Sequence, residues 1–209
     1  MEACVKPCPQ AGFCGGEVDA GHTDLGKSKV TRPSAQDRHQ PLHVDVIALP
    51  HPTILETRTV HWPDEAACAA FAGRMARAIG ESAELGNAVI ELNGPLGAGK
   101  TSFVRHLLQA LGVSGRIKSP TYAVVEPYSL PGLEISHFDF YRFDDPREWE
   151  DAGFRDLYAK PGLKLAEWPE KAAGLLPSAD LRLCINPTGD EQREVTIDVT
   201  SAIGRGLLR

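Results

Sequence analysis

An octapeptide, GPLGAGKT at residues 94–101, constrains the fold of this chain more than any other feature. It fits the pattern G-x-x-x-x-G-K-[ST] at every fixed position. An apolar run at residues 88–92 precedes it, and apolar residues at helical spacing follow it at residues 103–111. A strand, a glycine-rich loop and a helix in this order are typical of a phosphate-binding loop. The octapeptide therefore predicts an α/β fold built around a nucleoside triphosphate site.

Each residue type in the octapeptide has a physical role. Gly94, Gly97 and Gly99 allow backbone conformations that a Cβ atom would block, so consecutive N–H groups can point toward phosphate oxygens. Lys100 is expected to place its ammonium between the β- and γ-phosphates, and Thr101 is expected to hold Mg²⁺. A turn that only joined a strand to a helix would not need these two residues. The expected nucleotide-binding residues are Gly94, Leu96, Gly97, Ala98, Gly99, Lys100, Thr101 and Ser102.

Two carboxylates are candidates for metal binding and catalysis. Hydrolysis needs acidic groups near the loop, and in an open α/β sheet such groups lie at the carboxyl ends of strands. Asp139 ends the strand-like run 133–139, and Glu167 ends the run 162–167. Ordinary surface carboxylates are the alternative. Thr121 is a third catalytic candidate, because its hydroxyl could reach the metal or the γ-phosphate; a plain turn is the alternative there.

ATP is the expected nucleotide. A GTPase is expected to contain an Asn-Lys-x-Asp sequence that binds guanine, and no Lys-x-Asp triplet occurs in this chain. A P-loop small-molecule kinase is an alternative function, although residues 111–181 contain no Arg-rich insertion that could form a lid. A nucleotide-sensing scaffold that binds ATP without hydrolysing it is a further alternative.

Periodicity divides the chain into three parts. Residues 1–52 are rich in Gly, Pro, Ser, His and charges, which predicts a disordered or loosely ordered extension. Residues 53–200 are predicted to form the ATPase domain, a mixed sheet flanked by helices with antiparallel C-terminal strands, and residues 201–209 a tail. The expected strands lie at 53–60, 88–92, 122–128, 133–139, 162–167, 181–185 and 195–199. The expected helices lie at 63–79 and 103–111, with one or two short helices within 147–158.

Composition restricts the class of protein. With 22 Lys and Arg against 28 Asp and Glu, the formal net charge of −6 provides no overall field that attracts nucleic acid. No apolar run reaches the roughly 18 residues of a membrane-spanning helix, so we expect a cytoplasmic protein without membrane contact. The odd number of cysteines fits reduced thiols. Cys4, Cys8 and Cys14 lack the Cys-x-x-Cys pairs of a zinc site and are expected to be free thiols, with a zinc site that includes His22 as the alternative.

Four segments together resemble the TsaE family of bacterial P-loop ATPases, formerly YjeE, which take part in making threonylcarbamoyladenosine on tRNA. The segments are LNGPLGAGKTSFVR, SPTYAVVEPY, ISHFDFYRF and LAEWPE, in the order and roughly the spacing of the family, within residues 53–200. The resemblance implies a phosphate lysine at Lys100, a magnesium threonine at Thr101, a switch-like threonine at Thr121, a Walker-B-type aspartate at Asp139 and a catalytic-loop glutamate at Glu167.

The resemblance also implies a mode of action. Members of the family dock on TsaD and TsaB subunits, use ATP binding and slow hydrolysis to reset them, and contact tRNA only through the complex. Trp168 belongs to the family's Glu-Trp pair, with simple packing as the alternative. His137 is expected to satisfy the sheet edge, and Arg142 to form either a phosphate contact or a salt bridge. The family usually has aspartate where this chain has Pro95.

Overall fold

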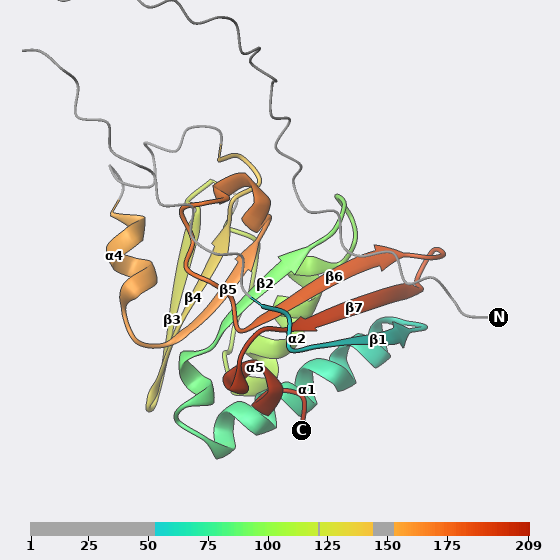
Figure 1. Cartoon of the computed structure of the whole chain (residues 1–209), viewed down its shortest axis with the longest axis horizontal. Coiled ribbons are helices and arrows are strands. Elements are labelled where there is room, and N and C mark those ends of the chain that lie inside the picture. The colour runs from blue at the N-terminus through green and yellow to red at the C-terminus, as the bar shows by residue number, and fades with distance from the viewer. Residues whose placement is uncertain (1–52, 121, 144–152) are drawn as a thin grey trace, which may run out of the picture. The chain divides into compact units, whose positions relative to one another are not determined.

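The described residues are built around a seven-stranded mixed sheet (Figure 1). The computed structural model describes residues 53–120, 122–143 and 153–209. The strand order is β1-β7-β6-β2-β5-β4-β3, in which β6, β2, β5 and β4 are parallel neighbours and the remaining pairings are antiparallel. The predicted mixed α/β fold is thus confirmed. The strands are β1 (Glu56–Trp62), β2 (Val89–Asn93), β3 (Val125–Leu130), β4 (Leu133–Asp139), β5 (Leu163–Glu167), β6 (Leu181–Pro187) and β7 (Arg193–Val199).

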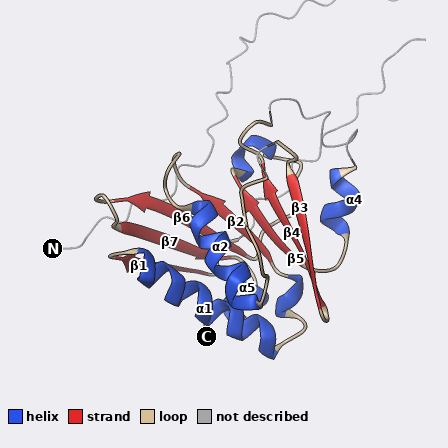
Figure 2. Ribbon diagram, turned by 180° about the vertical axis from the view of Figure 1, so that it is seen from behind, coloured by secondary structure: helices blue, strands red, loops and turns tan. Residues whose placement is uncertain are grey.

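Two long helices pack together on one face of the sheet, in front of it in Figure 2. α1 (Glu65–Glu81) begins where the Asp64 side chain accepts the amide of Ala67 at 2.8 Å, a typical N-cap. α2 (Lys100–Leu111) lies between Gly99 and Gly112, both at positive φ, and Gly112 ends it as a left-handed C-cap. The shorter helices are α4 (Phe154–Ala159), α5 (Ala202–Gly206) and two 3-10 turns at Leu85–Asn87 and Pro169–Ala172.

The pairing of β4 with β5 decides which side chains share a face. Ile135 pairs with Leu163, and two residues further on His137 pairs with Leu165. Because side chains alternate along a strand, these residues share one face. Ile135, Leu163 and Leu165 belong to the hydrophobic core that also contains Phe103 of α2.

The opposite face of the same strands is also covered. Phe138 and Ala166 pair there and join a second core with Phe154 and Tyr158 of α4. Because β4 and β5 are buried on both faces, the polar residues within them are removed from water and must find partners inside the protein.

Some boundaries differ from the predicted ones. The strand expected from residue 122 begins at Val125, because the amides of Ala123 and Val124 both donate to the carbonyl of Pro120 and form a turn. The predicted helix at 147–158 is described only from Phe154 onward. Residues 201–209, expected to be a tail, contain α5, and Leu207 is 1% exposed within the main core.

Several expectations fall outside the described residues. These are the extension at 1–52 with its three cysteines, and Thr121. Within the ranges that are described, the helices are too short or too polar to cross a membrane.

Candidate functional site

The loop between β2 and α2 leaves a series of backbone amides without acceptors. We call residues 94–101 the glycine loop. Gly94, Gly97 and Gly99 have φ values of 135°, 78° and 102°. Within the described part of the chain, Ala98 donates to the carbonyl of Pro95, but no hydrogen bond is formed by the amides of Gly97, Gly99, Lys100 and Thr101. Four unpaired donors at a helix N-terminus favour an anion, because they add to the positive end of the helix dipole.

Gly94 is the residue of this loop that tolerates no side chain. A Cβ atom there would lie 2.2 Å from the carbonyl oxygen of Ile185 on β6, whereas a Cβ atom at Gly97 would meet nothing within 4 Å. The loop therefore approaches the neighbouring strand as closely as backbone atoms allow.

Alanine substitutions at Gly94 and Gly97 are expected to lower the free energy of unfolding by different amounts. Both introduce a Cβ at positive φ, which costs about 1–2 kcal/mol. Gly94→Ala also forces backbone apart, so we expect it to lower the free energy of unfolding by about 3 kcal/mol or more. Urea denaturation of both variants measures the difference. Equal losses would contradict the close approach described above.

Lys100 is held inside the glycine loop. Its Nζ donates to the carbonyls of Gly94 at 2.5 Å and Pro95 at 3.0 Å, and lies 3.7 Å from the ring centroid of Trp168. The residue is 5% exposed. Burial lowers the pKa of Lys100, and the nearby charge of Glu167 opposes that shift. A buried ammonium surrounded by neutral acceptors is ready to bind a phosphate or another anion.

Asp139 and Glu167 lie side by side at the carboxyl ends of β4 and β5, where they are paired in register. This confirms the prediction that each ends a strand. Glu167 accepts the Thr101 hydroxyl at 2.8 Å through Oε2. Asp139 accepts the hydroxyl of Ser119 through Oδ2 and the amide of Tyr141 at 2.9 Å through Oδ1. Both are almost fully buried, at 3% and 2% exposed. We call these two residues the carboxylate pair.

His137 belongs to this arrangement, although sequence reasoning placed it at a sheet edge. That expectation was wrong, because β4 lies between β5 and β3 and the histidine is fully buried. Its Nε2 lies 2.8 Å from Oε1 of Glu167, and its Nδ1 has no hydrogen-bond partner among the described residues. The imidazole therefore fixes the orientation of the Glu167 carboxylate. The sequence did contain a signal for this position: side chains alternate along a strand, so His137 lies on the same face as Asp139.

Trp168 and Arg142 occupy different surroundings near the site. The Trp168 ring lies under the Lys100 ammonium and 5.0 Å from the Tyr141 ring, so it contacts a predicted binding residue and packs as well. The Arg142 guanidinium lies 4.5 Å from the ring centroid of Tyr122 and 3.4 Å from its hydroxyl. Among the described residues Arg142 forms no salt bridge, and its contact is with Tyr122.

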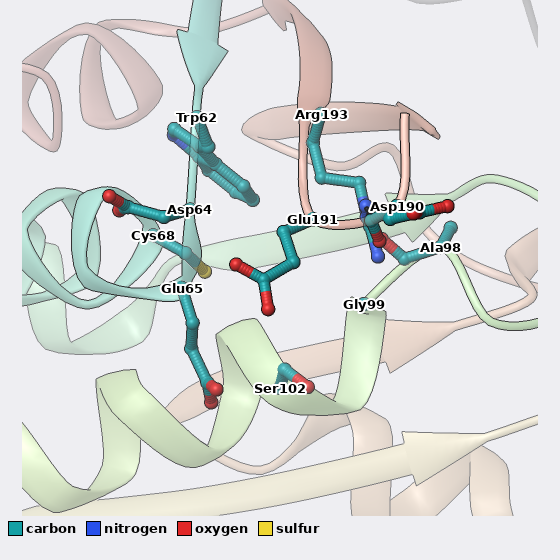
Figure 3. A pocket seen from close by; sticks show the side chains of 10 residues that line it. All are labelled: Trp62, Asp64, Glu65, Cys68, Ala98, Gly99, Ser102, Asp190, Glu191 and Arg193. Atoms are coloured by element: carbon teal, nitrogen blue, oxygen red, sulfur yellow. Dashed lines mark hydrogen bonds between the residues drawn. The ribbon is translucent and has the colours of Figure 1, made fainter. Parts of the chain in front are cut away.

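A pocket lies beside the glycine loop, on the side of Ala98 and Gly99. We call it the acidic pocket; its volume is about 150 Å³, and Figure 3 shows the Glu191 side chain pointing into it toward Ser102. Ala98 and Gly99 also line it, whereas the side chain of Leu96 is 74% exposed. The charged residues that line it are Asp64, Glu65, Asp190, Glu191 and Arg193.

Arg193 was not singled out from the sequence. Its Nε donates to the carbonyl of Ala98 at 2.8 Å, and its Nη1 holds the β6–β7 loop by donating to the carbonyls of Asp190 at 3.2 Å and Gln192 at 2.9 Å. Arg193 thus connects the glycine loop to the loop between β6 and β7, which lies about 90 residues further along the sequence. A lone arginine in a strand carries no signal of this role.

The described residues contain no cluster of three or more His, Cys, Asp or Glu side chains that could hold a metal ion. Thr101 and the carboxylate pair instead offer one hydroxyl and two carboxylates. Mg²⁺ is usually held by one or two carboxylates together with substrate phosphates and water. The donor set present therefore fits a metal that arrives with a phosphate ligand.

Comparison with known proteins agrees with this geometry. The family model "Threonylcarbamoyl adenosine biosynthesis protein TsaE" matches residues 62–195. The tRNA threonylcarbamoyladenosine biosynthesis protein TsaE of Haemophilus influenzae is 37% identical over 154 residues, which are 74% of this chain and 97% of that protein. The protein of the same name from Bacillus subtilis is 36% identical over 52% of this chain and 67% of its own length.

Among solved structures, YdiB of Bacillus subtilis superposes with a TM-score of 0.56 at 23% identity, over 73% of this chain and 91% of that chain. This similarity supports the fold. Because the family model spans most of the described sheet and the Haemophilus influenzae protein is matched over nearly its whole length, this chain belongs to the TsaE family.

Proposed function

We propose that this chain binds ATP with Mg²⁺ at the glycine loop and hydrolyses it slowly, in support of threonylcarbamoyladenosine formation on tRNA. One observation carries the proposal: the unpaired loop amides, the buried Lys100 ammonium and the carboxylate pair converge at one edge of the sheet. The names of the relatives state the pathway.

The glycine loop and Lys100 would bind the phosphates. The amides of Gly97, Gly99, Lys100 and Thr101 are free to donate, and helix N-termini favour phosphate. Lys100 would exchange the neutral carbonyls of Gly94 and Pro95 for charged oxygens. Hydrogen bonds between charged partners are stronger than those to neutral acceptors, so this exchange favours binding.

Thr101, Asp139 and Glu167 would hold Mg²⁺, as the donor set described above allows. When bound, Mg²⁺ would neutralise negative charge on the phosphates of the nucleotide. Glu167 would accept a hydrogen bond from the attacking water and orient it, because His137 keeps its carboxylate in place. Asp139 is restrained in the same way by Ser119 and by the amide of Tyr141.

The acidic pocket would receive the nucleoside. Its four carboxylates repel phosphate groups, but they accept hydrogen bonds from ribose hydroxyls and from the amino group of adenine. The pocket shares Gly99 with the glycine loop, so a nucleotide whose phosphates bind the loop can reach it. The apolar surface of Trp62 and Cys68 would contact the base.

The partners proposed for this chain are TsaD and TsaB subunits, which ATP binding and hydrolysis would reset between turnovers. In this role the chain contacts tRNA through the complex and works in the cytoplasm. The net charge of −6 supports this arrangement, because an acidic protein binds the phosphate backbone poorly without help.

Incubation with γ-labelled ATP, a metabolite panel and the TsaD and TsaB subunits tests the proposed function. We expect label to appear as free phosphate, with turnover raised about tenfold or more by the subunits, because positioning of catalytic groups is worth at least that much. Label transferred to a metabolite would indicate a small-molecule kinase and contradict the proposal. Binding of ATP without release of phosphate in any mixture would indicate a scaffold.

A further inference from the structure

A groove of about 500 Å³ runs beside the carboxylate pair. One wall is the stripe of α2 formed by Thr101, Arg105 and Gln109, which recur every four residues on one side of the helix. The other wall is the segment 115–119 that follows the helix. We call this hollow the basic groove.

Every ionisable side chain that lines the basic groove is a cation, namely Arg105, Arg116 and Lys118. Arg116 and Lys118 are exposed, and neither has an ion-pair or hydrogen-bond partner among the described residues. Arg105 lies 3.9 Å from the Glu65 carboxylate, which is 67% exposed, so this contact neutralises little of its charge. In a chain of net charge −6, the groove is a local positive field that attracts an anion.

The groove is directly connected to the carboxylate pair. Two of its lining residues, Thr101 and Ser119, donate their hydroxyls to Glu167 and Asp139. An anionic group that fills the groove therefore contacts the same side chains that orient the proposed catalytic carboxylates.

The lining favours an acidic peptide over nucleic acid. Proteins that bind single-stranded nucleic acid stack bases on aromatic side chains, and no aromatic residue lines this groove. A long polyanion would also meet the acidic surface of the rest of the chain. A short acidic segment avoids both problems, because arginine and lysine pair with its carboxylates within the groove.

We propose that the basic groove docks an acidic peptide segment of a partner protein and that docking acts on the carboxylate pair through Thr101 and Ser119. The inference rests on the proposed function, in which the chain works against partner subunits. It gives a physical reason for activity that depends on the complex: the peptide shifts the two hydroxyls that hold the carboxylates.

Charge reversal in the groove tests the inference. The double variant Arg116→Glu with Lys118→Glu is compared with Arg77→Glu with Lys160→Glu, which makes the same charge change at exposed positions elsewhere. The probes are the TsaD and TsaB subunits, an octaglutamate peptide and a tRNA anticodon hairpin. We expect the groove variant to bind the subunits and the peptide about tenfold or more weakly, with a smaller dependence on salt than the wild type. We expect the control variant to bind both as the wild type does.

Two results would overturn the inference. The first is a failure of the predicted peptide binding, either because the wild-type chain does not bind the peptide or because the groove variant binds the subunits and the peptide as well as the wild type does. The other is a hairpin that binds the wild type and is lost in the groove variant, which would assign the groove to RNA. ATP affinity is measured separately on each isolated chain. A wild type that fails to bind ATP refutes the proposed function, whereas the peptide measurement still decides the role of the groove.

Discussion

Replacing Lys100 with methionine is expected to weaken ATP binding about 100-fold or more, since two charge-assisted hydrogen bonds contribute about 3 kcal/mol or more together. The fold should be little affected. Burial lowers the pKa of Lys100, which means that the folded state disfavours its charged form, so we expect removal of that charge to cost little stability. The carbonyl of Pro95 also keeps the amide of Ala98 as a donor. Calorimetric titration with ATP and Mg²⁺ measures the affinity, and thermal denaturation measures the stability.

Lys164 provides a matched control for this prediction. It is also a buried lysine, 4% exposed, with its Nζ donating to the carbonyls of Lys160 and Gly162 and its pKa lowered by burial. It lies near the start of β5, whereas Glu167 lies at the other end of that strand. Lys164→Met is expected to keep wild-type ATP affinity. Equal ATP affinity in the Lys100 variant and the wild type would contradict the proposed role of Lys100.

Replacing Glu167 with glutamine is expected to lower ATP hydrolysis about 100-fold or more in the assembled complex, while ATP binding changes by no more than about threefold. Glutamine keeps the shape of the side chain and can still bond to Thr101 and His137, but it lacks the negative charge that attracts the metal and polarises water. Single-turnover release of labelled phosphate measures the rate of ATP hydrolysis, and calorimetric titration measures the affinity for ATP.

Glu91 offers the control for Glu167. It is a buried carboxylate on β2, 8% exposed, that pairs with Arg182 at 2.8 Å; burial raises its pKa. Its register partner is Ala166, which belongs to the core on the opposite face from the carboxylate pair. Glu91→Gln is expected to hydrolyse ATP at the wild-type rate. Wild-type turnover in the Glu167 variant would instead favour a nucleotide-sensing scaffold.

The parts of the site that follow local patterns could be predicted from the sequence. The glycine loop is defined by eight consecutive residues, and its neighbours show the periods of a strand and a helix. Asp139 and Glu167 were predicted as strand ends because strand-like runs stop there, and the structure ends β4 and β5 at these residues. Local patterns of this kind specify secondary structure and the edge of the sheet where polar groups gather.

The parts that depend on contacts between distant segments could not be predicted. Sequence reasoning did not give the order in which β2, β5 and β4 lie, so the register that pairs Asp139 with Glu167 was not accessible. The same holds for the contact between Lys100 and Trp168 and for the bond from Arg193 to Ala98. Each of these contacts joins segments that are far apart in the sequence and are brought together only by tertiary packing.

Titration of the full isotope-labelled chain with ATP and Mg²⁺, followed by NMR of the backbone amides, tests the central claim most directly. The account predicts that the amide signals of Gly97, Gly99, Lys100 and Thr101 shift most and that they exchange more slowly with solvent, because these unpaired donors acquire phosphate acceptors. Shifts confined to other parts of the chain, with these four signals unmoved at saturation, would contradict it.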